Sequence, residues 1–302
     1  MNTPSTIDEA LQQARRATGL PTLELRLLMQ TVCGFNNTQI MSRGNETLSP
    51  EDQAHFVSLS QRRQAGEPMA YILGEREFFS RPFKVTPAVL IPRPDTEDVV
   101  TQAIAWIRQR LAQQPHDQLS VLDIGTGSGA IALTLALECP GVQMVASDIA
   151  ADALAVAQHN AQQLGVPAVR LIQGDMLDAV RTHLPNARFD LIISNPPYIE
   201  AGDPHLDQGD LRHEPPDALT DHGDGLRFYR VIAQESPGFL KAGGAVIVEH
   251  GYQQQAAVVQ LFEQGLFASV RGFPDLSGNP RGVLASLELQ RNTPISITIQ
   301  SV

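Results

Sequence analysis

The chain has 302 residues, which is enough for one large domain or two ordinary ones, each with a buried core. Its 33 acidic and 22 basic residues give a formal charge of −11 at pH 7. This balance argues against sequence-independent binding to nucleic acid, because such binding depends on neutralising phosphates.

Several further features predict the compartment. No run approaches the roughly 18 consecutive apolar residues of a membrane span. The polar, acidic segment at residues 6–9 is unlike a signal peptide, and Cys33 and Cys139 lack metal-ligand spacing. We therefore expect a cytoplasmic protein that binds neither membranes nor a metal ion, with both cysteines as ordinary thiols.

The N-terminal residues 1–74 predict a small helical domain. Apolar residues recur at helical spacing in two segments, at Ile7, Leu11 and Ala14 and then at Leu23, Leu25, Leu28 and Met29. Ser49 followed by Pro50 predicts the N-cap and first turn of a third helix that ends near Ala65. Residues 67–74 break the helical pattern.

Residues 75–93 predict a β-hairpin connector. Two short apolar segments, 77–79 and 83–85, flank Ser80-Arg81-Pro82 as the turn, and residues 89–91 extend the pairing. We expect Asp95 to cap a helix over residues 99–111. From there to residue 291 strands and helices alternate, as in a mostly parallel α/β sheet. The tail, residues 292–302, has no assigned role.

A glycine-rich loop predicts a nucleotide-like cofactor. Strand 121–124 is followed by Gly125-Thr126-Gly127-Ser128-Gly129 and then by a helix over 130–136. Glycine allows positive φ and close backbone approach, and the helix N-terminus offers free N–H groups. Asp148 closes the next strand, 142–147, about twenty residues further on, where an acid accepts hydrogen bonds from ribose hydroxyls. A cap of the helix after residue 150 is the alternative role for Asp148, and the loop alone leaves a nicotinamide-dependent oxidoreductase open.

The segment Asn195-Pro196-Pro197-Tyr198 follows a buried strand over residues 189–194. Two prolines cannot continue a central strand, because neither donates a ladder hydrogen bond. Asn195 is therefore held at the carboxyl end of a strand, where open α/β sheets bind ligands. Its amide and the ring of Tyr198 suit a planar group that bears an NH2.

Together these motifs resemble a known family. Residues 123–129 with Asn195-Pro196-Pro197-Tyr198 are similar to class I S-adenosylmethionine-dependent methyltransferases that act on amino or amide nitrogen. Further motifs narrow the resemblance to the HemK/PrmC family, the peptide-chain release factor glutamine N5-methyltransferases, over residues 7–289: Gly66-Glu67-Pro68, Ile91-Pro92-Arg93-Pro94-Asp95-Thr96-Glu97, Arg212-His213-Glu214-Pro215 and Asp224-Gly225-Leu226.

The resemblance implies an α/β fold: a class I (Rossmann-like) methyltransferase core over residues 94–291, with a seven-stranded sheet and a reversed last strand, after a helical substrate-recognition domain over 1–74. It implies S-adenosyl-L-methionine as cofactor and the Gly-Gly-Gln glutamine of class 1 release factors as substrate. Direct nucleic-acid binding is not expected, because the chain is acidic. We expect a monomer.

The resemblance also implies the site residues. The cofactor would be bound by Gly125, Thr126, Gly127, Ser128, Gly129, Asp148, Asp175, Met176 and Asn195. Relatives often have a larger aromatic residue at the position of Met176. In this chain Met176 would pack on the adenine through its polarizable sulfur. Asp175 would accept from the adenine amino group or cap a turn. The catalytic residues would be Asn195, Pro196 and Tyr198, and these with Pro197 would bind the substrate.

A primary amide is a weak nucleophile, so placement has to drive the reaction. The side-chain oxygen of Asn195 and the backbone carbonyl of Pro196 are suited to accept the two N–H bonds of the substrate, while Tyr198 packs on the flat amide. The methylated nitrogen retains one hydrogen and no longer satisfies both acceptors, which favours stopping after one methyl. Arg93 and Glu97 either shape the cofactor entrance or pin the connector, whereas His213 and Glu214 are expected to order a flap.

The sequence leaves four alternative functions open. A glutamine methyltransferase for a large-subunit ribosomal protein would use the same chemistry. A DNA adenine-N6 methyltransferase shares Asn195-Pro196-Pro197-Tyr198 but needs a basic target-recognition region and a pocket for a flipped base. An oxidoreductase or a non-enzymatic binding module would leave this segment unexplained.

Overall fold

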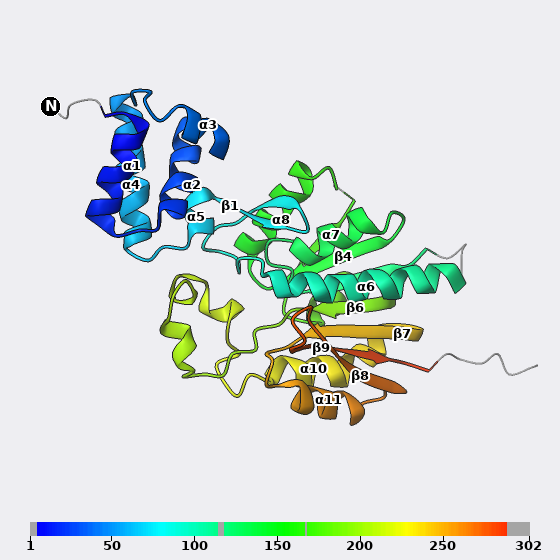
Figure 1. Cartoon of the computed structure of the whole chain (residues 1–302). Coiled ribbons are helices and arrows are strands. Elements are labelled where there is room, and N and C mark those ends of the chain that lie inside the picture. Colours follow the sequence, from blue (N-terminus) through cyan, green and yellow to red (C-terminus); the bar gives the residue numbers. More distant parts are fainter. Residues whose placement is uncertain (1–4, 114–117, 167, 289–302) are drawn as a thin grey trace, which may run out of the picture. The chain divides into compact units, whose positions relative to one another are not determined.

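A computed structural model describes residues 5–113, 118–166 and 168–288, and these residues form two compact units. The first unit combines Met1–Pro92 with Gly202–Leu219, and the second combines Arg93–Ala201 with Thr220–Val302. Figure 1 follows the chain by colour through both units. A segment that the sequence places inside the α/β region, residues 202–219, therefore belongs with the N-terminal unit.

The first unit is a bundle of helices. They are α1 (Ile7–Thr18), α2 (Thr22–Cys33), α3 (Asn37–Ser42), α4 (Pro50–Gln64) and α5 (Met69–Leu73). Leu25, Leu28 and Met29 of α2 are fully buried against Phe56 of α4. The predicted start of α4 is confirmed, because the Ser49 hydroxyl accepts a 3.0 Å hydrogen bond from the Asp52 N–H and Pro50 occupies the first turn.

The bundle differs from the prediction in three places. The helices α3 and α5 were not predicted, and α5 occupies part of the segment that was expected to break the helical pattern. Pro68 precedes α5 and Gly74 ends it in a left-handed conformation, so a single turn forms between two residues that usually stop helices. Leu23, expected on the apolar face of its helix, is 69% exposed.

The hairpin is confirmed, but its turn lies earlier than predicted. Strands β1 (Glu75–Phe78) and β2 (Arg81–Lys84) are antiparallel, with Phe78 opposite Arg81. The turn is therefore Phe79-Ser80, both at positive φ (52° and 59°), as in two-residue hairpin loops. Pro82 lies within β2, which is tolerated because a two-stranded ribbon has only edge strands. The expected extension at residues 89–91 is wrong, since no strand forms there.

The second unit contains a seven-stranded sheet in the order β5-β4-β3-β6-β7-β9-β8. Its strands are β3 (Ser120–Ile124), β4 (Gln143–Asp148), β5 (Arg170–Gln173), β6 (Phe189–Ser194), β7 (Leu240–Glu249), β8 (Ser269–Pro274) and β9 (Pro280–Ser286). Only the pairs that involve β9 are antiparallel, which confirms the predicted reversed last strand. Because β4 and β5 lie on one side of β3 and β6 on the other, the chain changes direction between β3 and β6.

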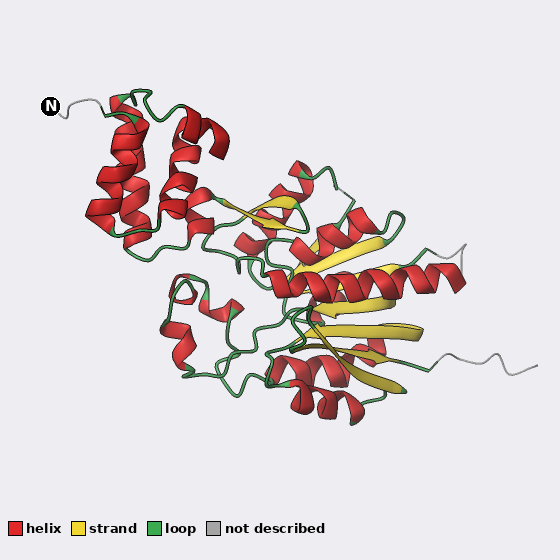
Figure 2. Ribbon diagram, viewed as in Figure 1, coloured by secondary structure: helices red, strands yellow, loops and turns green. Residues whose placement is uncertain are grey.

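Helices flank this sheet (Figure 2). They are α6 (Pro94–Gln113), α7 (Ala130–Glu138), α8 (Ala151–Gln163), α9 (Asp178–His183), α10 (Arg227–Glu235) and α11 (Gln255–Glu263), with short 3₁₀ turns η1 (Pro204–Asp207), η2 (Leu211–His213), η3 (Pro216–Ala218) and η4 (Ser236–Phe239). The core under α10 and α11 includes the buried rings of Phe189, Tyr229 and Phe262.

The helices of this unit differ from the prediction in two places. The helix α9 was not foreseen, and α6 begins at Pro94 rather than near residue 99. Asp95 therefore does not cap α6 but lies in its first turn. There its carboxylate forms an ion pair with Arg281 at 2.7 Å. The tail at residues 292–302 and the last residues of the predicted α/β region, 289–291, lie outside the described residues. Within the described ranges, no helix has the length and apolar character needed to cross a membrane.

Candidate active site

Strand register brings the predicted motifs to one edge of the sheet. Ile124 at the end of β3 pairs with Ser147 on β4 and with Ser194 on β6. Gly125 and Asn195 therefore leave the sheet from neighbouring strands at the same level, at the switch point where α/β sheets bind ligands. The Ser194 hydroxyl fastens this edge by donating a 2.8 Å hydrogen bond to the carbonyl of Ile124.

The glycine loop is tied directly to Asp148. The Gly127 N–H donates to Asp148 Oδ2 at 2.8 Å, and the Ala150 N–H donates to Oδ1 at 2.9 Å. Burial raises the pKa of Asp148, while these backbone donors favour its charged form. A carboxylate has about four acceptor positions, so Asp148 retains lone pairs for further hydroxyl groups. The alternative role of Asp148 as a helix cap is wrong, because Ala150 is the N-cap of α8 and no described side chain caps this helix. The hydrogen bond from the Ala150 N–H reaches Asp148 before the helix begins.

Asp123 supports the loop from inside the sheet, and the sequence analysis did not single it out. Its side chain is fully buried, and Oδ2 accepts a 2.7 Å hydrogen bond from the Thr126 hydroxyl. Oδ1 has no partner among the described residues, and burial raises the pKa of Asp123 to about 7. The available signal was an acidic residue inside an otherwise apolar strand, which is costly without a role.

A third loop follows β5. The Gly174 N–H donates to the carbonyl of Asp148 at 3.0 Å, and a Cβ at Gly174 would lie 2.8 Å from the Cα of Ala179. Only glycine fits this approach to α9. Met176 follows at φ 43° and lines a pocket of about 140 Å³.

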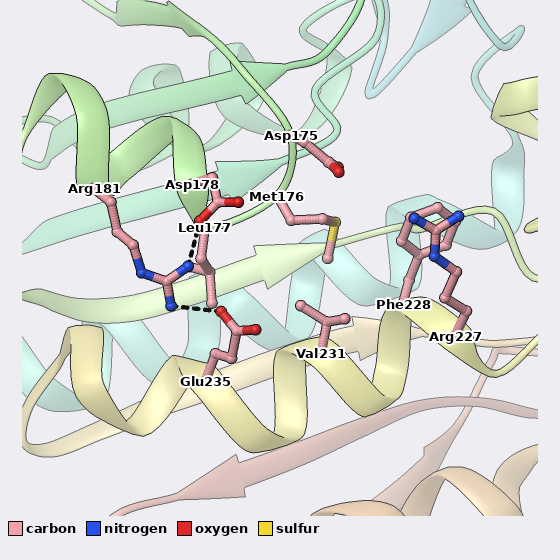
Figure 3. A pocket seen from close by; sticks show the side chains of 9 residues that line it. All are labelled: Asp175, Met176, Leu177, Asp178, Arg181, Arg227, Phe228, Val231 and Glu235. Carbon is pink, nitrogen blue, oxygen red and sulfur yellow. Dashed lines mark hydrogen bonds and ion pairs between the residues drawn. The ribbon is translucent and has the colours of Figure 1, made fainter.

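Figure 3 shows this pocket between α9 and α10. The Met176 side chain extends toward Val231, and Asp175 lies at the rim (Figure 3). Phe228 and Arg227 of α10 line it as well, and the Arg227 guanidinium lies over the Phe228 ring at 5.3 Å from its centre.

Ile149 is a second residue that sequence reasoning missed. It follows Asp148 immediately, and its large aliphatic side chain is 63% exposed. A single exposed apolar residue is ordinary, but Ile149 adjoins Asp148, which is hydrogen-bonded to the glycine loop. The signal was an apolar residue between the strand-ending acid and the next helix.

Asn195 is half-buried, and its Nδ2 donates to the Thr96 hydroxyl at 3.3 Å. Pro196 is buried, and the ring of Tyr198 packs on the core of the unit. The Tyr198 carbonyl accepts a 2.9 Å hydrogen bond from Gln254 Nε2, which holds the segment in place. Burial, with the nearby Glu249 charge, raises the pKa of Tyr198 well above its usual range, so its phenol stays neutral at physiological pH.

Glu214 and the segment near Asp224 contribute to structure. In the first unit, Glu214 Oε2 accepts a 2.9 Å hydrogen bond from the Ile91 N–H. The chain turns near Asp224, where the neighbouring Asp221 carboxylate accepts from the N–H groups of Gly223, Gly225 and Arg227 at 2.8, 3.0 and 2.9 Å. In the part of the chain that the structure describes, no group of three or more His, Cys, Asp or Glu side chains is arranged to hold a metal ion.

Comparison with known proteins agrees with this geometry. Residues 98–255 match the model of the methyltransferase small domain, and residues 6–74 match that of the PrmC N-terminal domain. A release factor glutamine methyltransferase from Bordetella pertussis is 46% identical over 87% of this chain and 94% of its own length. The chain belongs to the release factor glutamine methyltransferase family. A member from Escherichia coli is 41% identical over 91% of this chain and 95% of its own length.

Solved structures show the same fold. A methyltransferase from Pyrococcus furiosus gives a TM-score of 0.51 at 16% identity, covering 77% of this chain and 99% of its own. The hMettl16 catalytic domain in complex with MAT2A 3'UTR hairpin 1 gives 0.54 at 15% identity, covering 82% and 84%. Membership of the family confirms the predicted Rossmann-like fold and the prediction that the protein is an S-adenosyl-L-methionine-dependent methyltransferase. The alternative of a nicotinamide-dependent oxidoreductase is therefore wrong.

Proposed function

We propose that this protein methylates the side-chain amide nitrogen (N5) of the glutamine in the Gly-Gly-Gln motif of class 1 release factors, and so modulates translation termination. The observation that carries the proposal is the 41–46% identity to release factor glutamine methyltransferases over most of the chain. The position of Asn195 beside the glycine loop supports it, because a primary amide needs an acceptor next to the methyl donor.

The cofactor fits the residues at the edge of the sheet. Asp123 Oδ1 has no partner in the described structure. It would accept a hydrogen bond from the ammonium group of S-adenosyl-L-methionine, whose methionine end would lie near Gly125-Thr126-Gly127-Ser128-Gly129. The free lone pairs of Asp148 would accept the ribose hydroxyls. Ile149 and Met176 would pack on the adenine, with Asp175 at its amino group. When bound, the sulfonium supplies an electrophilic methyl group.

Asn195 and Pro196 would orient the nucleophile. The Asn195 Nδ2 group donates a hydrogen bond to the Thr96 hydroxyl. The side-chain oxygen of Asn195 would therefore face the incoming substrate amide. That oxygen and the Pro196 carbonyl would accept the two substrate N–H bonds, while Pro197 holds the backbone and Tyr198 packs on the amide plane. A neutral Tyr198 is unsuited to act as a base, so the proton leaves the cationic methylated amide to solvent.

The domain organisation extends the proposal. We assign release factor recognition to the N-terminal helical domain, residues 1–74, a hairpin connector to 75–93 and methyl transfer to 94–291. Family membership supports this division, since the PrmC N-terminal domain model matches residues 6–74. A protein that modifies a translation factor would act in the cytoplasm, and we expect it to act as a monomer.

The proposal is tested by intact mass and peptide mapping of a purified release factor after incubation with the enzyme and S-adenosyl-L-methionine. We expect a gain of one methyl group on the Gly-Gly-Gln glutamine. Asn195→Ala should lower kcat by about 10²- to 10³-fold, as does the loss of one positioned polar group elsewhere. The exposed Asn279→Ala, in the same unit, is the matched control.

Other outcomes would contradict the proposed substrate or the proposed single methylation. If the release factor gains no mass while a large-subunit ribosomal protein gains one methyl, the glutamine chemistry stands and the substrate is wrong. A gain on adenine in DNA would overturn both. A gain of two methyl groups on the release factor would overturn the proposal that the two acceptors stop the reaction after one.

A further inference from the structure

Thr96 connects the site to a buried carboxyl group. Its hydroxyl accepts the hydrogen bond from Asn195 Nδ2 at 3.3 Å, and its side chain also hydrogen-bonds Glu249. Thr96 and Glu249 are 4% and 1% exposed. The two contacts form a chain from Glu249 through Thr96 to Asn195.

Strand register explains why these residues meet. Ser194 on β6 pairs with Val248 on β7, so the next residues, Asn195 and Glu249, leave the sheet at the same level. Thr96 comes from the first turn of α6, which is anchored by the ion pair of Asp95 with Arg281. Arg281 is held in turn by Asp275 at 3.2 Å.

A threonine hydroxyl has a single proton, and this limits the possible arrangements. An ionised carboxylate only accepts hydrogen bonds, so Thr96 must donate its proton to Glu249. The hydroxyl oxygen can then only accept from Asn195, which fixes the side-chain NH2 toward Thr96 and leaves the side-chain oxygen for the substrate. With the amide reversed, Asn195 would present donors to a substrate NH2 and repel it.

We propose that Glu249 is a positioning residue which, through Thr96, selects the amide orientation of Asn195 that is competent for methyl transfer. The proposal rests on the proposed function, since it assigns Asn195 to the substrate amide. Glu249 itself need not contact substrate or cofactor.

The surroundings of Glu249 make its charge state sensitive to pH. Burial raises its pKa to about 7, whereas Thr96 and the positive charge of Arg281 favour the ionised form. Its Oε2 has no partner among the described residues, so part of the burial cost is not offset. The ionisable groups that interact with it are Arg93, Asp95, Tyr198, Tyr229 and Arg281, and His250 follows it in the chain.

Protonation would remove the constraint on Thr96. A neutral carboxyl group can donate as well as accept, so the Thr96 proton becomes free to reach the Asn195 oxygen in the reversed orientation. The fraction of correctly oriented Asn195 therefore falls as pH drops through the pKa of Glu249. We expect kcat for release factor methylation to rise between about pH 6 and pH 8.

Glu249→Gln tests this mechanism, because glutamine also donates and accepts and so mimics the protonated acid at every pH. We expect kcat at pH 8 to fall about 10- to 100-fold, the usual effect of losing a partner that orients an active group. The variant should lose the rise in kcat between pH 6 and 8 and match the low-pH plateau of the wild type. Affinity for S-adenosyl-L-methionine should change less than twofold.

Variants of Thr96 separate positioning from folding. Thr96→Val keeps the shape and removes the hydroxyl, so it should lower kcat and abolish the rise with pH. Thr96→Ser restores the hydroxyl and should recover both. Thr101→Val is the matched control on the same helix and should leave kcat unchanged. Among the described residues, the Thr101 hydroxyl binds only the carbonyl of Glu97.

A readout without turnover completes the test. The ¹⁵N–¹H signals of the Asn195 side-chain amide should shift between pH 6 and 8 in the wild type and remain constant in Glu249→Gln. If wild type methylates the release factor and Glu249→Gln retains the pH rise, or if the Asn195 signals do not respond to pH, the inference is wrong while the function stands. If wild type fails to methylate the release factor, the proposed function itself is wrong.

Discussion

The backbone N–H of Gly127 donates a 2.8 Å hydrogen bond to Oδ2 of Asp148, which joins the loop after β3 to the end of β4. The two motifs that the sequence places 21 residues apart therefore form one surface. A change at Asp148 should affect the loop as well as the cofactor.

Asp148→Ala is expected to weaken binding of S-adenosyl-L-methionine by about 10- to 100-fold, because hydrogen bonds to a charged group contribute roughly 1.5–3 kcal/mol. Calorimetric titration measures the change. The control is Asp152→Ala, an exposed acid in the first turn of α8, which should alter affinity less than twofold. Equal effects of the two variants would contradict a ribose contact at Asp148.

Gly129→Ala is expected to destabilise the fold more than Gly165→Ala. Both glycines have positive φ (82° and 72°), so each alanine has a strain of about 1–2 kcal/mol. At Gly129, a Cβ would also lie 3.0 Å from Leu133 Cδ1, whereas nothing lies within 4 Å at Gly165. Crowding should add about 1–3 kcal/mol to the loss of unfolding free energy in urea. Equal losses would mean that α7 shifts freely to make room.

Met176→Phe should tighten binding of S-adenosyl-L-methionine about two- to tenfold, because an aromatic ring stacked on the adenine adds roughly 0.5–1.5 kcal/mol. Met176 lines a pocket of about 140 Å³. Met41→Phe, at a 62% exposed position in the first unit, is the control for a nonspecific effect. Unchanged or weaker affinity in Met176→Phe would show that this side chain does not face the purine.

Stability should fall as pH rises from 5 to 8. The folded-state pKa values of Asp123 and Glu249 are raised to about 7, so the folded protein binds more protons than the unfolded chain between the normal carboxyl range and pH 7. Each neutral carboxyl group stabilises the fold at low pH, and this contribution is lost as pH rises to 7. The loss of unfolding free energy is on the order of 3 kcal/mol per group.

The double variant Asp123→Asn with Glu249→Gln should remove most of this slope in urea unfolding measured across the pH range. At pH 8, Glu249→Gln alone should unfold at a higher temperature than wild type while turning over more slowly. A variant less stable than wild type at pH 8 would indicate that the charge of Glu249 is better compensated than its burial implies.

Arg63→Ala should loosen residues 203–214 in the first unit. Arg63 pairs with Glu24 at 2.8 Å and with Asp210 at 3.1 Å, and thereby fastens this segment to the helical bundle. Hydrogen exchange of the segment should accelerate severalfold. Arg62→Ala is the matched control, because Arg62 pairs only with Glu67 among the described ion pairs. Equal exchange in both variants would assign the anchoring to the other contacts of the segment, such as that of Glu214 with Ile91.

Local sequence patterns were sufficient for the central strands and the loops that follow them. An apolar run such as residues 189–194 cannot be exposed, and two prolines must end it, so strand β6 and the place of Asn195 were predictable from neighbours in the chain. Alternating glycines after β3 required a tight turn into a helix for the same local reason. These constraints act over a few residues and therefore remain visible in the sequence.

Contacts between distant residues required the tertiary structure. Thr96 and Asn195 are 99 positions apart, and only the pairing of β6 with β7 and the anchoring of α6 bring them together with Glu249. The exposed position of Leu23 and the grouping of residues 202–219 with the first unit likewise depend on which surfaces are covered. The family, the cofactor and the amide group of the substrate were all predictable from the sequence, because each depends on a short motif. Only the fold decided which carboxyl group orients Asn195, because that depends on packing between elements that carry no local trace of one another.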